Sequence, residues 1–274
     1  MTRITGAMKL AGIVGNPVTH SLSPVIHNTW IEALGLDAVY AAFSPADSAG
    51  FDTLVAAGRA GLLAGVNVTA PFKEQAYALA DEASDTARAS ASANILRFRD
   101  GRVSADSADG EGLLWALKDQ APDLDLADAS VVMLGAGGAA RAAVAALASA
   151  GARVRIVNRT RERAEALAAD IGLGVIATDM AGAFKDARLI VNALSVRPDI
   201  DPTIFEPETV VLDMTYRPIE TPFLKAAKTV GLTTVDGLGM LIGQARPSFR
   251  ALFDTEPPPL DPRPILLAHL GEAG

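Results

Sequence analysis

Cysteine is absent from the 274 residues of this chain, which excludes disulfide bonds and thiol chemistry. Histidine occurs only three times, as His20, His27 and His269, without Asp or Glu at metal-ligand spacing. A metal site is therefore not expected. No apolar run reaches the roughly 18 residues that a membrane-spanning helix needs. The N-terminus also lacks a basic segment followed by an apolar core, so no export signal is expected.

An excess of positive charge is absent as well. The formal net charge is -8, from 24 Lys and Arg against 32 Asp and Glu, which argues against a general nucleic-acid binder. Half of the residues are hydrophobic, enough for a full core in roughly two domains of about 150 residues each. We therefore expect a soluble, cytoplasmic α/β protein. Its oligomeric state, monomer or homodimer, stays open at this point.

Strand and helix patterns alternate along the chain, which is typical of a largely parallel sheet. Short apolar runs predict strands at 8–14, 39–43, 66–69, 131–134, 154–157, 189–191 and 210–213. Helical periodicity predicts helices at 51–59, 72–80, 110–118, 139–150, 161–170, 222–230, 240–253 and 265–270. Residues 94–98 and 103–105, joined through Asp100-Gly101, predict a hairpin instead. The first unit is expected to end near Asp109.

The strand at 131–134 is apolar at every position, and a glycine-rich turn follows it directly. This turn is Gly135-Ala136-Gly137-Gly138-Ala139-Ala140, a G-x-G-x-x-A motif. In such a motif Gly135 makes the tight turn, Gly137 lets a pyrophosphate approach the backbone, and Ala140 keeps the next helix close to the sheet. The N-terminus of that helix adds free N–H groups and the positive end of its dipole. The motif predicts a dinucleotide-binding domain of the Rossmann type.

The next strand ends at Asn158-Arg159-Thr160 rather than at an acidic residue. An NAD-binding domain normally presents Asp or Glu here to the ribose 2′-hydroxyl, and such a carboxylate would repel a 2′-phosphate. Arg159 can stack on the adenine or make a bidentate contact to that phosphate, and Arg163 adds a second guanidinium. Cations beside a helix N-terminus are unfavourable for stability. A purely structural role as surface charges at the helix start therefore explains these arginines less well. NADP is the predicted cofactor.

Small polar side chains gather at strand ends and corners of the first unit. They are Ser21, Ser23, Asn67, Thr69, Lys73, Asn94 and Asp109. Taken singly, each has a local explanation: Ser23 as a helix N-cap with Pro24 at the first helical position, or Asn94 as a turn residue. Taken together, they lie where α/β proteins bind ligands. Hydroxyls and amides around one ammonium predict an NADP-dependent reductase of a small polar acid.

The chain resembles the shikimate dehydrogenase family over nearly its whole length. The shared segments are Ser21-Leu22-Ser23-Pro24, Asn67-Val68-Thr69-Ala70-Pro71-Phe72-Lys73, Asn94, Asp109-Gly110, Gly135 to Arg141, Asn158-Arg159-Thr160 with Arg163, Tyr216, and Asp236-Gly237-Leu238-Gly239-Met240-Leu241 with Gln244. The resemblance implies reversible reduction of 3-dehydroshikimate to shikimate by NADPH in aromatic amino-acid biosynthesis. With it we predict two α/β domains. Residues 1–109 with 240–274 form an N-terminal, mostly parallel substrate-binding catalytic domain to which the C-terminal helices return, and residues 110–239 form the NADP-binding Rossmann domain.

The resemblance also implies a role for each matching residue. Lys73 and Asp109 form the catalytic pair and contact the substrate, whose carboxylate is held by Ser21 and Ser23. The ring substituents of the substrate are bound by Asn67, Thr69, Asn94, Tyr216 and Gln244. The cofactor contacts are Gly135, Ala136, Gly137, Gly138, Ala139, Asn158, Arg159, Thr160 and Arg163, with Met214 and Gly237 lining the nicotinamide pocket.

Three segments depart from the family pattern. Ser107-Ala108-Asp109 stands where Asn-Thr-Asp is usual, Ala93-Asn94-Ile95 where Val-Asn-Thr is usual, and Asn192-Ala193-Leu194-Ser195-Val196 where Asn-Ala-Thr and a following Gly-Met are expected. These departures concern turnover and cofactor affinity more than the fold. Two alternatives stay open: a paralogue acting on quinate, and a binding protein with weakened catalysis. Retention of Lys73 and Asp109 argues against the second.

Overall fold

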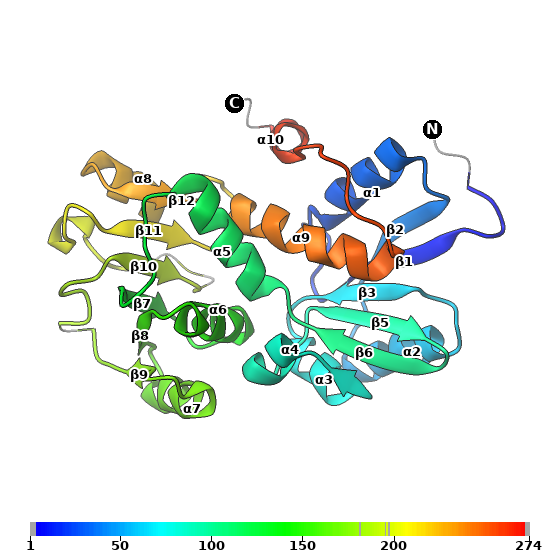
Figure 1. Cartoon of the computed structure of the whole chain (residues 1–274), viewed down its shortest axis with the longest axis horizontal. Coiled ribbons are helices and arrows are strands. Elements are labelled where there is room, and N and C mark those ends of the chain that lie inside the picture. Colours follow the sequence, from blue (N-terminus) through cyan, green and yellow to red (C-terminus); the bar gives the residue numbers. More distant parts are fainter. Residues whose placement is uncertain (1–3, 181, 195, 197, 272–274) are drawn as a thin grey trace. The chain divides into compact units, whose positions relative to one another are not determined.

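The computed structural model describes residues 4–180, 182–194, 196 and 198–271. The chain divides into two compact units, shown in Figure 1: unit 1 comprises Met1–Ala108 and Gln244–Gly274, and unit 2 comprises Asp109–Gly243. The chain enters unit 2 at the first residue of helix α5 (Asp109–Gln120) and returns to unit 1 within helix α9 (Gly237–Phe253).

Unit 1 is built on a six-stranded mixed sheet with the order β2-β1-β3-β5-β6-β4. Its strands are β1 (Lys9–Val14), β2 (Ala38–Phe43), β3 (Gly65–Val68), β4 (Glu82–Ala83), β5 (Ile95–Arg99) and β6 (Arg102–Asp106). Strand β1 pairs in parallel with β2 and β3, whereas β5 is antiparallel to both β3 and β6. The predicted hairpin is confirmed, and its turn residues Asp100 and Gly101 have φ values of 51° and 75°. Positive φ at both turn positions is what a tight hairpin needs.

The helices of unit 1 are α1 (Ser23–Leu34), α2 (Ser48–Arg59), α3 (Lys73–Ala78), α4 (Asp85–Ser90), α10 (Arg263–Leu270) and the C-terminal part of α9. The predicted N-cap of α1 is wrong. The cap position is Leu22, which makes no side-chain cap bond, and Ser23 is already helical. The Ser23 amide donates to Ser21 Oγ at 3.2 Å instead, while the Ser23 side chain is buried, at 3% exposure. Its hydroxyl is thereby left for tertiary contacts.

Unit 2 has a six-stranded, fully parallel sheet with the order β12-β11-β10-β7-β8-β9. Its strands are β7 (Ser130–Leu134), β8 (Arg153–Val157), β9 (Ile176–Ala177), β10 (Leu189–Asn192), β11 (Val210–Asp213) and β12 (Thr233–Val235). Its other helices are α6 (Gly138–Ser149), α7 (Arg161–Ile171), the 3-10 turn η1 (Pro202–Ile204) and α8 (Pro222–Thr229). The strand order reverses beside β7, which defines the topological switch point of a Rossmann sheet. The predicted dinucleotide-binding fold is confirmed.

Small residues set how closely the helices of unit 2 pack. Ala140, Ala143 and Leu147 of α6 are at most 1% exposed and belong to the core that covers the β7 face of the sheet. A Cβ on Gly110, in the first turn of α5, would lie 2.6 Å from the Ala146 Cβ of α6. Only glycine allows this approach, so Gly110 fixes the backbone that follows Asp109.

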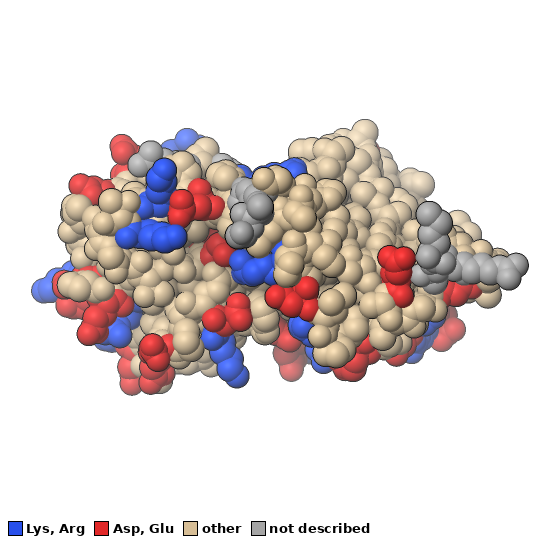
Figure 2. Space-filling view, turned by 90° about the horizontal axis from the view of Figure 1, so that it is seen from above, with Lys and Arg blue, Asp and Glu red and all other residues tan. Residues whose placement is uncertain are grey.

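The surface view in Figure 2 shows basic side chains scattered among acidic ones. Among the residues described, no helix has the length and apolar content required to cross a membrane. The same described residues include no group of three or more His, Cys, Asp or Glu side chains that could hold a metal ion.

Candidate active site

The loops after β1 and β3 meet at one edge of the unit 1 sheet. The Thr69 amide donates to Val14 O at 2.9 Å, and the Asn16 amide donates to Ala70 O at 3.1 Å. A Cβ on Gly15 would lie 2.2 Å from Thr69 Cγ2, so the first loop can lie against Thr69 only because it carries glycine there. The two parallel strands thus bring both loops, with their predicted substrate residues, to the same edge.

Asn94 ties together the segments that carry Lys73 and Asp109. Because β5 runs antiparallel to β3, its first residues lie at the edge where β3 ends. The Ala93 amide donates to Lys73 O at 3.0 Å, and the Ala108 amide donates to Asn94 Oδ1 at 2.9 Å. Asp109 is the next residue after Ala108. The side chain of Asn94, 3% exposed, therefore organises this edge rather than a turn.

Lys73 and Asp109 each begin a helix. Lys73 is the first residue of α3 and is partly buried; it follows Phe72, whose ring stacks on Phe51 with centroids 4.9 Å apart and planes 4° apart. Asp109 is the first residue of α5 and is 7% exposed. A carboxylate at a helix N-terminus is stabilised by the dipole, whereas an ammonium is not. The dipole of α5 therefore stabilises the charge of Asp109, whereas the dipole of α3 does not stabilise the charge of Lys73.

Asn67 lies in a buried polar network that the sequence does not reveal. Tyr40 Oη donates to Asn67 Oδ1 at 2.8 Å, and Asn67 Nδ2 donates to Asn94 O at 3.0 Å and to Ser248 Oγ at 2.8 Å. Tyr40 and Ser248 were not among the predicted site residues. No motif marks them, because each meets Asn67 only through the fold, from 27 and 181 residues away.

The predicted substrate residues are distributed over both units. Those in unit 1 are Ser21, Ser23, Asn67, Thr69, Lys73, Asn94 and Gln244. Asp109 and Tyr216 belong to unit 2. Gln244, on α9, is buried at 8% exposure, and Tyr216 is partly buried in the loop after β11.

The glycine-rich turn of unit 2 is open where a phosphate would lie. Gly135 has φ +111°, a conformation that favours glycine. A Cβ built on Gly137 would meet no heavy atom within 4 Å, and α6 receives no side-chain cap bond from that residue. The N–H groups of Gly138 and Ala139 at the helix start are therefore suited to an anion, with Ala136 in the turn before them. These residues fit the diphosphate of a dinucleotide.

Cations follow β8, as predicted. Arg159 and Arg163 are exposed, and within the described part of the chain neither forms an ion pair with an acidic residue. Arg161 between them is already engaged, with Glu165 at 2.7 Å and Asp179 at 2.8 Å. Asn158 Nδ2 donates to Thr160 O at 2.8 Å and shapes the loop, and the Thr160 hydroxyl makes no cap bond to α7. Two uncompensated guanidinium groups in an acidic protein fit a 2′-phosphate.

Met214 and Gly237 meet in unit 2. A Cβ on Gly237 would lie 2.4 Å from the Met214 carbonyl oxygen, so only glycine lets the two backbones come this close. Asp213, just before Met214, accepts from the Thr215 amide at 3.0 Å and from Thr221 Oγ1 at 2.8 Å. Asp213 therefore fixes both ends of the loop that carries Met214 and Tyr216, a role that sequence reasoning missed.

The departures from the family pattern have different structural consequences. At Ala108 the backbone N–H, not a side chain, bonds to Asn94, so loss of a side-chain hydrogen-bonding group leaves this contact intact. The Ser107 hydroxyl is buried without a partner in the described structure. In the loop after β10, Asn192 Oδ1 accepts from the Leu194 amide at 3.2 Å, whereas Ser195 lies outside the described residues.

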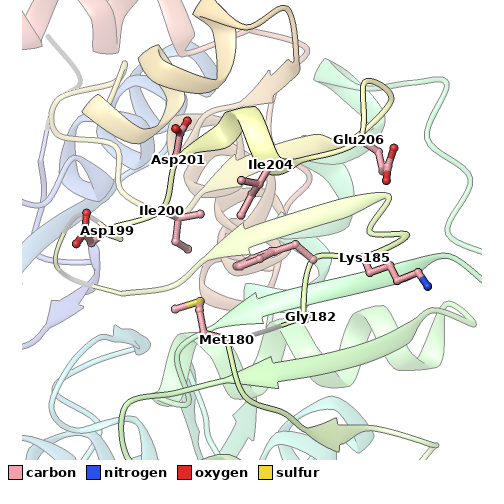
Figure 3. A pocket seen from close by; sticks show the side chains of 9 residues that line it. Met180, Gly182, Lys185, Asp199, Ile200, Asp201, Ile204 and Glu206 are labelled. Atoms are coloured by element: carbon pink, nitrogen blue, oxygen red, sulfur yellow. The ribbon is translucent and has the colours of Figure 1, made fainter.

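None of the predicted site residues lines a hollow of about 740 Å³ on unit 2 (Figure 3). Its apolar wall includes Phe184, Ile200 and Ile204, and its charged side chains are Lys185, Asp199, Asp201 and Glu206. With three carboxylates against one ammonium, this hollow would repel the phosphates of a dinucleotide. The open turn at Gly135 and the exposed Arg159 fit the charge of a dinucleotide better.

A Rossmann sheet with an open phosphate turn, joined in one chain to an α/β unit with polar side chains at its strand ends, defines a dinucleotide-dependent dehydrogenase. Two family profiles match the chain: the shikimate dehydrogenase substrate binding domain over residues 13–96, and shikimate / quinate 5-dehydrogenase over residues 116–203. The shikimate dehydrogenase (NADP(+)) of Caulobacter vibrioides is 49% identical over 281 aligned positions, covering 98% of both chains. The chain belongs to the NADP-dependent shikimate dehydrogenase family.

Solved structures agree with this assignment. Shikimate 5-dehydrogenase from Thermus thermophilus, in complex with NADP(H) and shikimate, superposes with a TM-score of 0.84 at 36% identity, covering 93% of this chain and 96% of that one. Quinate dehydrogenase from Corynebacterium glutamicum, in complex with NAD, has a TM-score of 0.83 at 29% identity, covering 91% and 95%. The fold is thus shared by enzymes named for two substrates.

Proposed function

We propose that this chain catalyses the reversible reduction of 3-dehydroshikimate to shikimate with NADPH, a step of aromatic amino-acid biosynthesis. It is an NADP-dependent oxidoreductase that acts on a CH–OH group. The observation that carries this conclusion is the 49% identity to a shikimate dehydrogenase over 98% of the chain. The open glycine turn supports the cofactor, as do Arg159 and Arg163, which form no ion pair with the acidic residues that the structure describes.

Lys73 and Asp109 are the proposed catalytic pair. Bound NADPH supplies the hydride that reaches the carbonyl carbon. As that carbon is reduced, its oxygen gains negative charge and needs a proton, which the Lys73 ammonium delivers, while Asp109 orients this ammonium. General acid assistance of this kind contributes about 10²–10⁴-fold in rate. The position of Lys73, unexplained by helix stability, supports this role.

The remaining polar residues bind the substrate. Ser21 and Ser23 hold its carboxylate. The groups on its ring are bound by Asn67, Thr69, Asn94, Tyr216 and Gln244. Support comes from the shared sheet edge at which Asn67, Thr69 and Asn94 lie, and from the loop fixed by Asp213 that carries Tyr216.

The cofactor residues divide into three groups. Gly135, Ala136, Gly137, Gly138 and Ala139 cradle the diphosphate. The adenosine 2′-phosphate is bound by Arg159 and Arg163, beside Asn158 and Thr160. Met214 and Gly237 line the nicotinamide pocket, which their close backbone approach supports. Residues 1–109 with 240–274 are accordingly the substrate-binding catalytic domain, and residues 110–239 the NADP-binding domain.

The proposed setting is the cytoplasm, with shikimate and 3-dehydroshikimate as small-molecule partners and without nucleic acid or membrane. The enzyme acts as a monomer or a homodimer.

The test is turnover by the purified chain, followed through NADPH absorbance, with shikimate or quinate as substrate and NADP or NAD as cofactor. We expect the highest kcat/KM for the pair shikimate and NADP. Quinate is the second candidate substrate, because one matching family profile and one similar structure carry its name. A higher kcat/KM with quinate would reassign the substrate. Binding of shikimate and NADP without turnover would show a binding protein instead.

A further inference from the structure

The side-chain amide of Asn67 is buried, at 4% exposure, and its three hydrogen bonds fit only one orientation of the amide group. Its Nδ2 donates to the Asn94 carbonyl oxygen at 3.0 Å and to Ser248 Oγ at 2.8 Å. Its Oδ1 accepts from Tyr40 Oη at 2.8 Å. Both amide protons are therefore already used within the protein.

Two carbonyl oxygens determine this direction. Asn94 O can only accept, and Ser248 Oγ gives its own proton to Gln244 O at 2.9 Å, so Ser248 must accept from Asn67. Turning the amide over would set Oδ1 against the Asn94 carbonyl and leave a buried donor unmatched, which is unfavourable. The orientation of the Asn67 side chain thus follows from the network around it.

Tyr40 closes the network on the other side. Its ring is fully buried and stacks on His27, with centroids 4.1 Å apart and planes 2° apart. Burial raises the pKa of Tyr40 well above its ordinary value, and a hydrogen bond from the Ser23 hydroxyl opposes that rise. Tyr40 therefore keeps its proton and directs it to Asn67 Oδ1. One phenol oxygen connects two residues, Ser23 and Asn67, that belong to the proposed substrate site.

We propose that Tyr40 and Ser248 are positioning residues that hold Asn67 as a hydrogen-bond acceptor, so that the substrate oxygen at this amide must be a hydroxyl. The inference rests on the proposed function of Asn67 in binding the ring. After these three bonds, the Asn67 amide can form one more hydrogen bond, through the second lone pair of Oδ1. A hydroxyl can donate to this lone pair, whereas a ketone oxygen has no proton to donate. The site thereby keeps the ketone of 3-dehydroshikimate away from Asn67 and leaves it to the ammonium of Lys73, a donor.

The experiment measures the binding of shikimate and of analogues in which one ring hydroxyl at a time is replaced by fluorine, which accepts but does not donate. With the unaltered protein we expect one analogue to bind about tenfold more weakly than shikimate, equivalent to about 1.4 kcal/mol. Tyr40→Phe, which keeps the ring on His27, and Ser248→Ala each remove one of the three protein hydrogen bonds that set the direction of the amide, so the turned amide is populated more often in both variants. The ratio of Kd values for that analogue and shikimate should then fall to about threefold or less.

Thr209→Ala is the matched control, since Thr209 is 1% exposed and donates to Ala187 O at 2.7 Å in unit 2, outside this network. We expect it to lower Tm while leaving both Kd values and their ratio unchanged. A role of Tyr40 and Ser248 in stability alone would also lower Tm without changing the ratio, and an unchanged ratio in both variants would overturn the proposal. Failure of the unaltered protein to bind shikimate would instead refute the proposed function. If only one of the two variants folds, an unchanged ratio in that variant overturns the proposal.

Discussion

At the scale of single residues, the position of Lys73, the proposed proton donor, is set by its neighbour Phe72. Phe72 is 3% exposed and stacked on Phe51, so it anchors the backbone at the start of α3. The next side chain carries positive charge beside the positive end of a helix dipole, which disfavours it. The helix dipole of α3 therefore does not account for a cation at this position, in keeping with the proposed role of Lys73 as proton donor.

We expect Lys73→Ala to lower kcat about 100-fold or more while KM for shikimate changes about threefold or less, because proton donation matters mainly in the transition state. Steady-state kinetics at saturating NADP measure both constants. Lys118→Ala, at an exposed position of α5, is the control and should behave like the unaltered enzyme. A rise in KM without loss of kcat would assign Lys73 to binding alone.

Arg159→Asp should lower the preference for NADP over NAD about 100-fold, since it replaces a charge-assisted contact by repulsion of the 2′-phosphate. The measurement is the ratio of kcat/KM values for the two cofactors. Arg161→Gln is the matched control because Arg161 is engaged by Glu165 and Asp179, and the ratio should stay the same. An unaltered ratio in Arg159→Asp would refute the phosphate contact.

His27 makes folding sensitive to acid. Burial lowers its pKa to about 3, and neither ring nitrogen has a hydrogen-bond partner in the described structure. The unfolded chain binds a proton near pH 6.5 whereas the folded chain does not, so the free energy of unfolding falls as the pH drops below this value. The loss from this residue reaches about 2 kcal/mol at pH 5.

His27→Phe should therefore weaken the decline of stability between pH 7 and pH 5, as measured by urea unfolding at several pH values. The variant keeps a ring against Tyr40 and leaves no buried nitrogen without a partner. An equally steep decline in the variant would show that His27 is not the group responsible.

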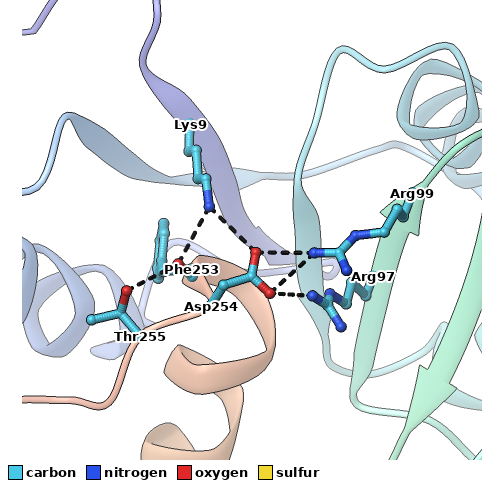
Figure 4. Close-up of polar contacts among 6 residues, drawn as sticks. All are labelled: Lys9, Arg97, Arg99, Phe253, Asp254 and Thr255. Atoms are coloured by element: carbon cyan, nitrogen blue, oxygen red, sulfur yellow. Dashed lines mark hydrogen bonds and ion pairs between the residues drawn. The ribbon is translucent and has the colours of Figure 1, made fainter.

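At the scale of elements, one carboxylate ties the end of α9 to the unit 1 sheet. Asp254 follows α9 directly and pairs with Lys9 of β1 at 3.3 Å, with Arg99 of β5 at 3.1 Å, and with Arg97 of β5 (Figure 4). Burial raises the pKa of Asp254, but Arg97, Lys9 and Arg99 outweigh it and hold the pKa below its ordinary value. The stabilisation is therefore present above the unfolded pKa near 4 and is lost as the pH falls through the folded value.

Asp254→Asn should lower the free energy of unfolding at pH 7 by about 1 kcal/mol. The loss is this small because solvent weakens ion pairs of a partly exposed carboxylate, and it should be smaller still at high salt. Asparagine tolerates the φ of 56° at this position, so the change isolates the charge. Glu220→Gln, which breaks an exposed pair with Lys228, is the control and should have no measurable effect. Urea unfolding at low and high salt measures this loss of stability. An equal loss at both salt concentrations would show that packing of the side chain, and not its charge, is responsible.

At the scale of the whole molecule, the two units should respond to different ligands. Binding to the folded state alone stabilises it by about 2.7 kcal/mol at a ligand concentration of 100 Kd. We expect NADP to slow amide hydrogen exchange mainly in 131–163 and shikimate mainly in 65–73 and 93–96. NADP should give no such protection in Arg159→Asp at the same concentration. Protection of unit 1 alone by NADP would contradict the assignment of the cofactor to unit 2.

Much of this protein follows from local sequence. The hairpin follows from Asp100-Gly101, whose φ values suit a tight turn, and the Rossmann sheet follows from buried runs that alternate with helices. The glycine turn was predictable because its conformation depends on neighbouring residues only. Strands β4, β9 and β12 and helix α4 were not predicted, since elements of two to six residues show no clear periodicity.

Sequence alone determined the family, the cofactor class and the order of helices and strands, because these depend on patterns and motifs within a few residues. The tertiary structure alone decided which way the Asn67 amide points, that Asn94 joins two loops, and that Asp213 holds the loop of Met214. Each of these contacts depends on strand register or on side chains from separate elements, and the direction of a hydrogen bond is set only once its partner is in place.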